Sequence, residues 1–145
     1  MMTESYFSST TSVLKTVAHL GLPYEIIEID TDLADTALFC EKYGYPVDQS
    51  GNTIIVASKK EPKLFAACVV LATTKLDVNK CVRNLMGVSK VSFATDEEMK
   101  ELTGMQVGGV TPFSLSKEIK LYVDSRIMGL NWLILGGGGR DKKLK

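Results

Sequence analysis

The sequence predicts a mixed α/β (α+β) fold, in which a largely antiparallel, barrel-like sheet carries peripheral helices. Three observations predict it: helical segments alternate with short strands, the two longest strand candidates are joined by a polar turn, and no repeat or interdomain linker interrupts the chain. The 145 residues, 45% of them hydrophobic, suit one compact globular unit. We therefore expect one domain over residues 1–145.

The N-terminal third alternates helix and strand. Apolar residues at helical spacing, closed by Gly21, predict a first amphipathic helix. Residues Tyr24–Ile29 are β-branched and aromatic and predict a strand. Asp32 or Asp35 can then cap a second short helix that ends near Gly44.

The centre of the chain predicts a hairpin followed by a helix. Residues Thr53–Ala57 and Leu64–Ala72 flank a polar, proline-containing turn at residues 59–62. We expect these two strands to be antiparallel neighbours. Asp77 can cap a third helix, which Gly87 closes.

The C-terminal part predicts three further strands and one helix. Residues Lys90–Phe93 form a short strand candidate, and the capping box at Thr95–Glu98 opens a helix that ends at Gly104. After a long loop, Ile119–Val123 and Trp132–Leu135 are strand candidates. The last of them runs into four consecutive glycines.

Charge and composition narrow the classes of function. Lys+Arg and Asp+Glu are both 17, so no global positive field can hold a polyanion and any nucleic-acid contact needs a local patch. The N-terminus has no signal-like region, and the longest apolar stretch, residues 64–72, is too short to span a bilayer. We therefore expect a cytoplasmic protein without a membrane segment. Three cysteines without a C-x-x-C pair favour buried free thiols.

The loop at residues 107–113 is the most unusual local feature, because Gly108 and Gly109 are paired shortly before Pro112. Paired glycines let the backbone turn sharply and approach a ligand, so this loop can present amides to a carbonyl or an oxyanion. The alternative is an ordinary tight connection between a helix and a strand. If the loop grips a ligand, a side chain at Gly109 should obstruct the ligand and leave folding nearly intact.

Recognisable cofactor and catalytic motifs are missing from the sequence. The glycines at 136–139 lack the P-loop and dinucleotide-binding patterns, so we expect no nucleotide cofactor. The single histidine, His19, points away from the apolar stripe of the first helix, and neither G-x-S-x-G nor H-E-x-x-H occurs. An enzyme built on this chain would use backbone groups and water, with no metal and no cofactor.

Positive charge gathers in two places that could contact phosphates. The first is the central turn, with Lys59, Lys60 and Lys63. The second is the C-terminal tail, with Arg140, Lys142, Lys143 and Lys145. The alternatives are a solvated turn and a frayed terminus.

The order of several motifs resembles that of the YbaK/ProX proteins, relatives of the editing domain inserted in bacterial prolyl-tRNA synthetases. Residues 103–113 resemble the family segment "TGy-vGGvsPfg". Residues 48–56 resemble its "v-KTlvv" strand, and residues 121–124 resemble its "v-iD" strand. Residues 132–137 are similar to its closing "i-v-gG" segment, so the likeness covers roughly residues 20–139.

The resemblance implies the YbaK/ProRS editing-domain fold and hydrolysis of the ester that joins a wrong amino acid to the tRNA 3′ end. The catalytic residues that it implies are Asn52, at the position of the family's lysine, Gly108 and Gly109. The implied substrate-binding residues are Thr53, Val110, Thr111, Pro112, Gly136 and Gly137. The implied tRNA-binding residues are Arg140, Lys142 and Lys143.

The implied partner is a mischarged aminoacyl-tRNA, with Pro-type tRNA favoured, and prolyl-tRNA synthetase is a second possible partner. The protein would act as a monomer or a homodimer, away from membranes. One alternative is a non-catalytic module that binds acyl-tRNA or a synthetase, because Asn52 replaces the lysine. Another is a binding protein for a small molecule or an amino acid, which the zero net charge favours.

Overall fold

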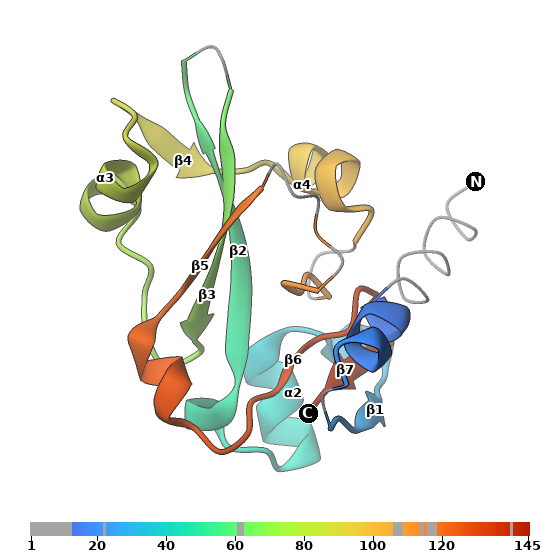
Figure 1. Cartoon of the computed structure of the whole chain (residues 1–145). Helices are drawn as coiled ribbons and strands as arrows, with labels where there is room; N and C mark the ends of the chain where they lie inside the picture. Colours follow the sequence, from blue (N-terminus) through green and yellow to red (C-terminus); the bar gives the residue numbers. More distant parts are fainter. Residues whose placement is uncertain are drawn as a thin grey trace.

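A computed structural model describes residues 13–21, 23–60, 63–105, 109–113, 115, 119–139 and 141–145, and Figure 1 shows the arrangement. Residues 13–19 are helical. The other α-helices of the described residues are α2 (Thr36–Tyr43), α3 (Arg83–Met86) and α4 (Asp96–Thr103). The strands are β1 (Ile26–Glu28), β2 (Gly51–Ser58), β3 (Phe65–Leu71), β4 (Val91–Phe93), β5 (Lys120–Val123), β6 (Leu135–Gly136) and β7 (Lys142–Leu144).

The larger of two sheets has the strand order β4-β2-β3-β5 and is built around the predicted hairpin. Strands β2 and β3 are antiparallel, with Gly51 opposite Leu71 and Ala57 opposite Phe65. Strand β4 pairs antiparallel with β2, whereas β5 runs parallel to β3. The mixed, largely antiparallel sheet is therefore confirmed.

The smaller sheet has the order β1-β7-β6, and both of its pairings are antiparallel. It lies beside the lower part of β2 in Figure 1, next to α2. The two sheets meet at an isolated parallel bridge between Ser50 and Ile134, where Gly51 N donates to Ile134 O at 2.8 Å. Because β6 has only two residues, the described strands do not close into a continuous barrel. The barrel-like arrangement that the sequence predicts takes the form of two separate sheets, which touch at this seam.

The apolar core divides among three clusters on different faces of the sheets. One joins the first helix to the larger sheet and includes Val17, Ile55 and Met105. A second lies on the other face of that sheet, around Val56 and Val82. The third packs α2 against the seam: Ile29, Ala34, Phe39, Cys40 and Ile134. Burial of α2 at the seam holds the start of this helix close to the start of β2.

The caps that the sequence predicts are mostly where it places them. Asp35, rather than Asp32, caps α2, and its Oδ1 accepts from Ala37 N at 3.1 Å. Gly44 ends this helix in the left-handed region, at φ 74°. The capping box of α4 is complete, since Thr95 and Glu98 each accept from the other's backbone N–H. The third helix differs, because residues Val78–Val82 form a π turn before α3.

Two expectations for the rest of the chain need correction. Strand β6 comprises Leu135–Gly136 rather than Trp132–Leu135, because residues 132–133 make no ladder. The frayed terminus is wrong, since Lys142–Leu144 form the middle strand of the smaller sheet. Of the three cysteines, Cys40 and Cys68 are buried as expected, whereas Cys81 is exposed.

Candidate functional site

A cavity of about 360 Å³ lies where the two sheets, the start of α2 and the start of α4 converge. Its polar and glycine lining comes from the starts of α2 and α4 and from the strands β2, β6 and β7. This set is Asp35, Thr36, Gly51, Asn52, Thr53, Asp96, Gly136 and Lys143. Its apolar lining is Ile54, Ile55, Phe93, Ala94, Met99 and Val110. A volume of this size is at the lower end of the range for small-molecule sites.

Asn52 is held in the cavity by the first turn of α2. The Thr36 hydroxyl donates to Asn52 Oδ1 at 2.6 Å. Because Asp35 caps α2 directly before Thr36, the helix start determines where this hydroxyl points. With Oδ1 occupied, the side-chain amide of Asn52 retains two N–H groups that can donate to a ligand.

Lys143 enters the same cavity from β7 and is only 4% exposed. Its Nζ lies 5.4 Å from the centre of the Phe39 ring, a distance at which a cation is attracted to an aromatic face. Its cross-strand partner is Gly136, which also lines the cavity. Lysine is almost never this buried without a compensating interaction, so the position is unusual for a residue of a basic tail.

The glycine loop and the four-glycine run pack against each other, backbone to backbone. Gly138 N donates to Gly109 O at 2.7 Å. A Cβ added at Gly109 would lie 2.3 Å from Gly139 O, and one added at Gly136 would lie 2.6 Å from Gly109 O. The expectation that a side chain at Gly109 leaves folding nearly intact is therefore wrong, because the space is filled by backbone of the same chain.

Two threonine hydroxyls near the cavity are buried without a hydrogen-bond partner among the described residues. They are Oγ1 of Thr53, which lines the cavity, and Oγ1 of Thr111, a residue that is 0% exposed. A buried hydroxyl without a partner costs free energy of roughly 1–3 kcal/mol. In a native structure each such group calls for an explanation, and a functional role is one of them.

The structure brings together part of the predicted site. The cavity is lined by Asn52, Thr53, Val110, Gly136 and Lys143. Gly109, Thr111 and Gly137 are buried beside it, while Pro112 is half-buried and does not line it. Lys142 makes an ion pair with Asp141 and also does not line it. Gly108 and Arg140 lie outside the described residues.

Sequence reasoning missed three polar residues of the cavity: Asp35, Thr36 and Asp96. Each sits at a helix start, and the cap of α2 together with the capping box of α4 located both starts. What the sequence lacks is any sign that these two starts face one cavity. The exposed carboxylates of Asp35 and Asp96 give the cavity an acidic rim, in contrast to the buried ammonium of Lys143.

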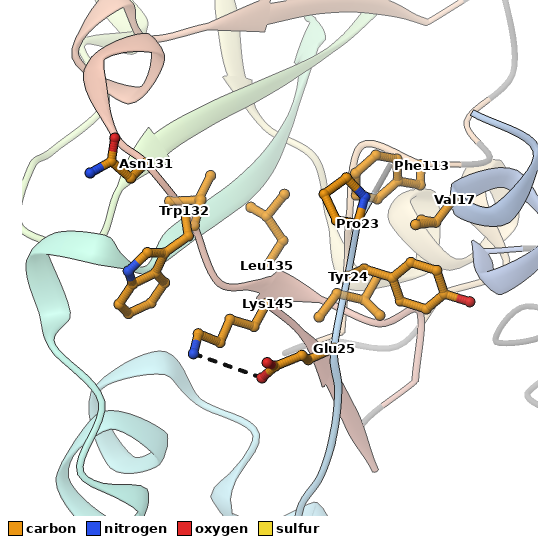
Figure 2. Close-up of a pocket in the computed structure, with 11 residues that line it drawn as sticks. Val17, Pro23, Tyr24, Glu25, Phe113, Asn131, Trp132, Leu135 and Lys145 are labelled. Atoms are coloured by element: carbon orange, nitrogen blue, oxygen red, sulfur yellow. Dashed lines mark ion pairs between the residues drawn. The ribbon is translucent and has the colours of Figure 1, made fainter. Parts of the chain in front are cut away.

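Figure 2 shows a second cavity, of about 550 Å³, whose lining residues in β6 and β7 alternate with those that line the first. Leu135 and Leu144, which are cross-strand partners, line it together with Phe113. Figure 2 shows Lys145 and Glu25 pointing toward each other, and their Nζ and Oε2 atoms are 3.7 Å apart. Lys145 Nζ also lies 4.9 Å from the Trp132 ring centre. This cavity is mostly apolar and contains none of the cavity residues that the sequence predicted.

Comparison with known proteins identifies the family. The sequence profile of the aminoacyl-tRNA editing domain matches residues 30–145. The chain belongs to the aminoacyl-tRNA editing domain family. The match covers every described segment that lines the first cavity, and it confirms the resemblance to YbaK/ProX-type editing proteins.

Solved structures share the editing-domain fold. The hypothetical protein APE2540 superimposes with a TM-score of 0.81 and 26% identity, over 92% of this chain and 86% of that one. A candidate trans-editing enzyme for prolyl tRNA synthetase superimposes with a TM-score of 0.78 and 23% identity, over 94% of this chain and 84% of that one. The predicted fold class is thereby confirmed.

Proline–tRNA ligases contain a related editing segment. The enzyme of Brachyspira hyodysenteriae is 32% identical over 71 residues, which are 48% of this chain and 12% of the ligase. The enzyme of Staphylococcus aureus strain MRSA252 is 29% identical over 113 residues, which are 77% of this chain and 19% of the ligase. The chain thus spans less than a fifth of the length of these ligases, and its likeness to them is that of an editing domain.

Two absences apply to the described part of the editing domain. No three His, Cys, Asp or Glu side chains in it lie close enough together to hold a metal ion. No helix in it is long and apolar enough to cross a membrane.

Proposed function

We propose that this editing domain is a trans-acting aminoacyl-tRNA deacylase, which hydrolyses the ester bond of mischarged tRNA with backbone-amide and water chemistry. Pro-type tRNA is the favoured substrate, because the curated relatives named above are proline–tRNA ligases. One observation carries the proposal. In a chain of the editing-domain family, Asn52, Val110, Gly136 and Lys143 line the same cavity.

The substrate ester would lie in this cavity with its carbonyl near Asn52. Thr36 occupies Oδ1 of Asn52, so the side-chain amide N–H groups are the donors that remain for the carbonyl oxygen. Backbone amides near Gly108 and Gly109 would orient the same ester from the loop side. A cavity of about 360 Å³ favours a small aminoacyl group attached to its ribose. These features support hydrolysis by a positioned water without a side-chain nucleophile.

The experiment is hydrolysis of Ala-, Cys- and Ser-charged tRNA(Pro) under single-turnover conditions, with the spontaneous rate subtracted. Asn52→Ala should lower the rate by about tenfold, because one donor to the carbonyl is lost. Asn52→Lys should shift the preference among the three aminoacyl groups, since a longer, charged side chain then occupies the cavity. Asn84→Ala, on the exposed side of α3, is the matched control and should keep the native rate. Native protein without hydrolysis above background on all three substrates contradicts the proposal.

A second candidate function is a non-catalytic module that binds acyl-tRNA or prolyl-tRNA synthetase. The neutral side chain of Asn52 favours it, because the resemblance places a lysine at this position. The same panel separates the two functions. A native protein that binds the charged tRNA without cleaving it, combined with hydrolysis gained in Asn52→Lys, supports the binding module.

A further inference from the structure

We propose that Lys143 is a catalytic residue of the deacylase, whose ammonium group faces the ester carbonyl oxygen in the cavity that Asn52 lines. The inference rests on the proposed function and extends it. Sequence reasoning places Lys143 on the tRNA surface, whereas its burial and its cavity position assign it to the aminoacyl end of the substrate.

The first support is charge inside the cavity. Among the described residues that line it, Lys143 is the only basic one, and it is 4% exposed. The acidic lining residues, Asp35 and Asp96, are exposed at the rim. Asn52 is neutral, so positive charge at the base of the cavity comes from Lys143. An ammonium group placed in a cavity can stabilise negative charge that develops on a ligand there.

The second support is the register of the smaller sheet. Lys143 is the cross-strand partner of Gly136, and a Cβ at Gly136 would lie 2.6 Å from both Gly109 O and Val110 O. The missing side chain at Gly136 therefore lets the glycine loop pack onto the sheet next to Lys143. Residues alternate between the two faces of a strand. Leu144 accordingly lines the other cavity, so Lys143 is the lysine that the register directs to the site.

The third support is the match between this charge pattern and an aminoacyl ester. Such an ester has an α-ammonium group next to a carbonyl group. The exposed carboxylates of Asp35 and Asp96 suit the ammonium, while Lys143 and the Asn52 amide suit the carbonyl oxygen. An aminoacyl ester thus has one group that suits the acidic residues of the cavity and one that suits Lys143 and Asn52.

The role of Lys143 is electrostatic. The oxygen of a water molecule bonds to the ester carbon, and the carbonyl electron pair moves onto the carbonyl oxygen, where the Lys143 ammonium stabilises the negative charge. When the carbonyl re-forms, the bond to the ribose oxygen breaks and a proton from the water passes to that oxygen. The products are a free amino acid and a tRNA with its terminal hydroxyl restored. Lys143 keeps its proton throughout.

The test compares Lys143→Met with Lys120→Met, a change at an exposed lysine of β5 that does not line the cavity. Lys143→Met keeps the length and the apolar stem but removes the charge, and should lower the single-turnover deacylation rate by about a hundredfold. Lys120→Met should stay within about threefold of the native rate. Lys143→Arg should retain more activity than Lys143→Met, since it keeps a donor and a charge. A thermal unfolding measurement on each variant shows whether a lower deacylation rate results from a loss of folded protein.

A charge-relocation variant separates a catalytic role from a structural one. In Lys143→Met combined with Asn52→Lys, an ammonium returns to the cavity from β2, and the rate should rise at least tenfold above that of Lys143→Met alone. A structural role of Lys143 predicts no such recovery. Equal rates of Lys143→Met and native protein, or no recovery in the folded double variant, overturn the inference.

A binding measurement keeps this inference distinguishable from the proposed function. If native protein cleaves the charged tRNAs and Lys143→Met does so equally well, the inference fails and the function stands. If native protein cleaves none of them, the function fails. In that case the affinity for a 3′-aminoacylamino-adenosine, whose amide resists hydrolysis, tests whether Lys143 contacts a bound aminoacyl group. A tenfold weaker affinity in Lys143→Met supports that role, and an equal affinity, or no binding to native protein, refutes it.

Discussion

The backbone N–H of Gly138 donates a 2.7 Å hydrogen bond to the carbonyl oxygen of Gly109. This bond joins the glycine loop to the glycine run that follows β6, and the two segments border the cavity that contains Asn52 and Lys143. Neither segment has room for a side chain at the contact. The glycines therefore hold the wall of the site together, whatever they contribute to a substrate.

Gly109→Ala should destabilise the fold. The new Cβ would lie 2.3 Å from Gly139 O, a backbone atom that cannot rotate away. We expect a loss of about 2–3 kcal/mol in the free energy of unfolding, as for other overpacked sites, measured by urea denaturation. Gly129→Ala is the control, because nothing lies within 4 Å of its Cβ position. A Gly109→Ala midpoint equal to that of the control would contradict the packing.

Thr36→Val should slow deacylation through Asn52. The variant keeps the shape of the side chain but removes the 2.6 Å hydrogen bond to Asn52 Oδ1. A neutral hydrogen bond contributes about 0.5–1.5 kcal/mol, so the single-turnover rate should fall by roughly two- to tenfold. Thr36→Ser keeps the hydroxyl and should restore most of the rate. The idea that Thr36 orients Asn52 fails if the Val and Ser variants are equally active.

Affinity for tRNA should depend on salt through the basic residues near the C-terminus other than the buried Lys143. Lys142 and Lys145 are half-buried and pair with Asp141 and Glu25, at 3.1 and 3.7 Å. If both contact phosphates, the variant with Lys142→Gln and Lys145→Gln should reduce the slope of log affinity against log salt by about two. Lys90→Gln, exposed before β4, should not change the slope. An unchanged slope in the double variant would place the tRNA contact elsewhere.

Glu98 should stabilise the fold in a pH-dependent way. The hydrogen bond from Lys63 and, next, the bond from the Thr95 backbone lower the pKa of Glu98 below its ordinary value of 4.5. A lowered pKa gives stability that is fully present above 4.5 and is lost as the pH falls through the folded-state pKa. The difference in urea midpoint between native protein and Glu98→Gln should therefore be largest near neutral pH and shrink in acid. Glu97→Gln, on the same turn, is the control for the helix-end charge. A difference that grows in acid contradicts the assignment.

Cys81 should be the one thiol that reacts readily with a thiol reagent near neutral pH. Burial, and to a lesser extent Cys81, raise the pKa of Cys68 to about 11, so Cys68 remains a protonated thiol. Cys40 is buried with its Sγ 3.2 Å from Ser50 Oγ. Reagent titration should show one fast equivalent, absent in Cys81→Ser. Two fast equivalents in the native protein would contradict the burial of Cys68 or Cys40.

Local signals in the sequence located most elements of the larger sheet and its helices. The cap at Asp35, the capping box at Thr95 and the turn of the β2–β3 hairpin each depend on residues a few positions apart. They can therefore be recognised from a short stretch of sequence. Short stretches of sequence did not predict the structure of the C-terminal residues. Lys142–Leu144 look like a charged tail, and only pairing with β1, more than a hundred residues earlier in the chain, makes them a strand.

The sequence by itself determined the fold class, the family and the loop and strand that contribute Asn52 and Val110 to the site. The tertiary structure alone decided that Lys143 faces Asn52's cavity, that Thr36 holds Asn52, and that Gly109 packs on Gly139. The physical reason is that composition and spacing report the preferences of one segment at a time. Which side of β7 is buried depends on the register with β1 and β6, and that register results from contacts between distant parts of the chain.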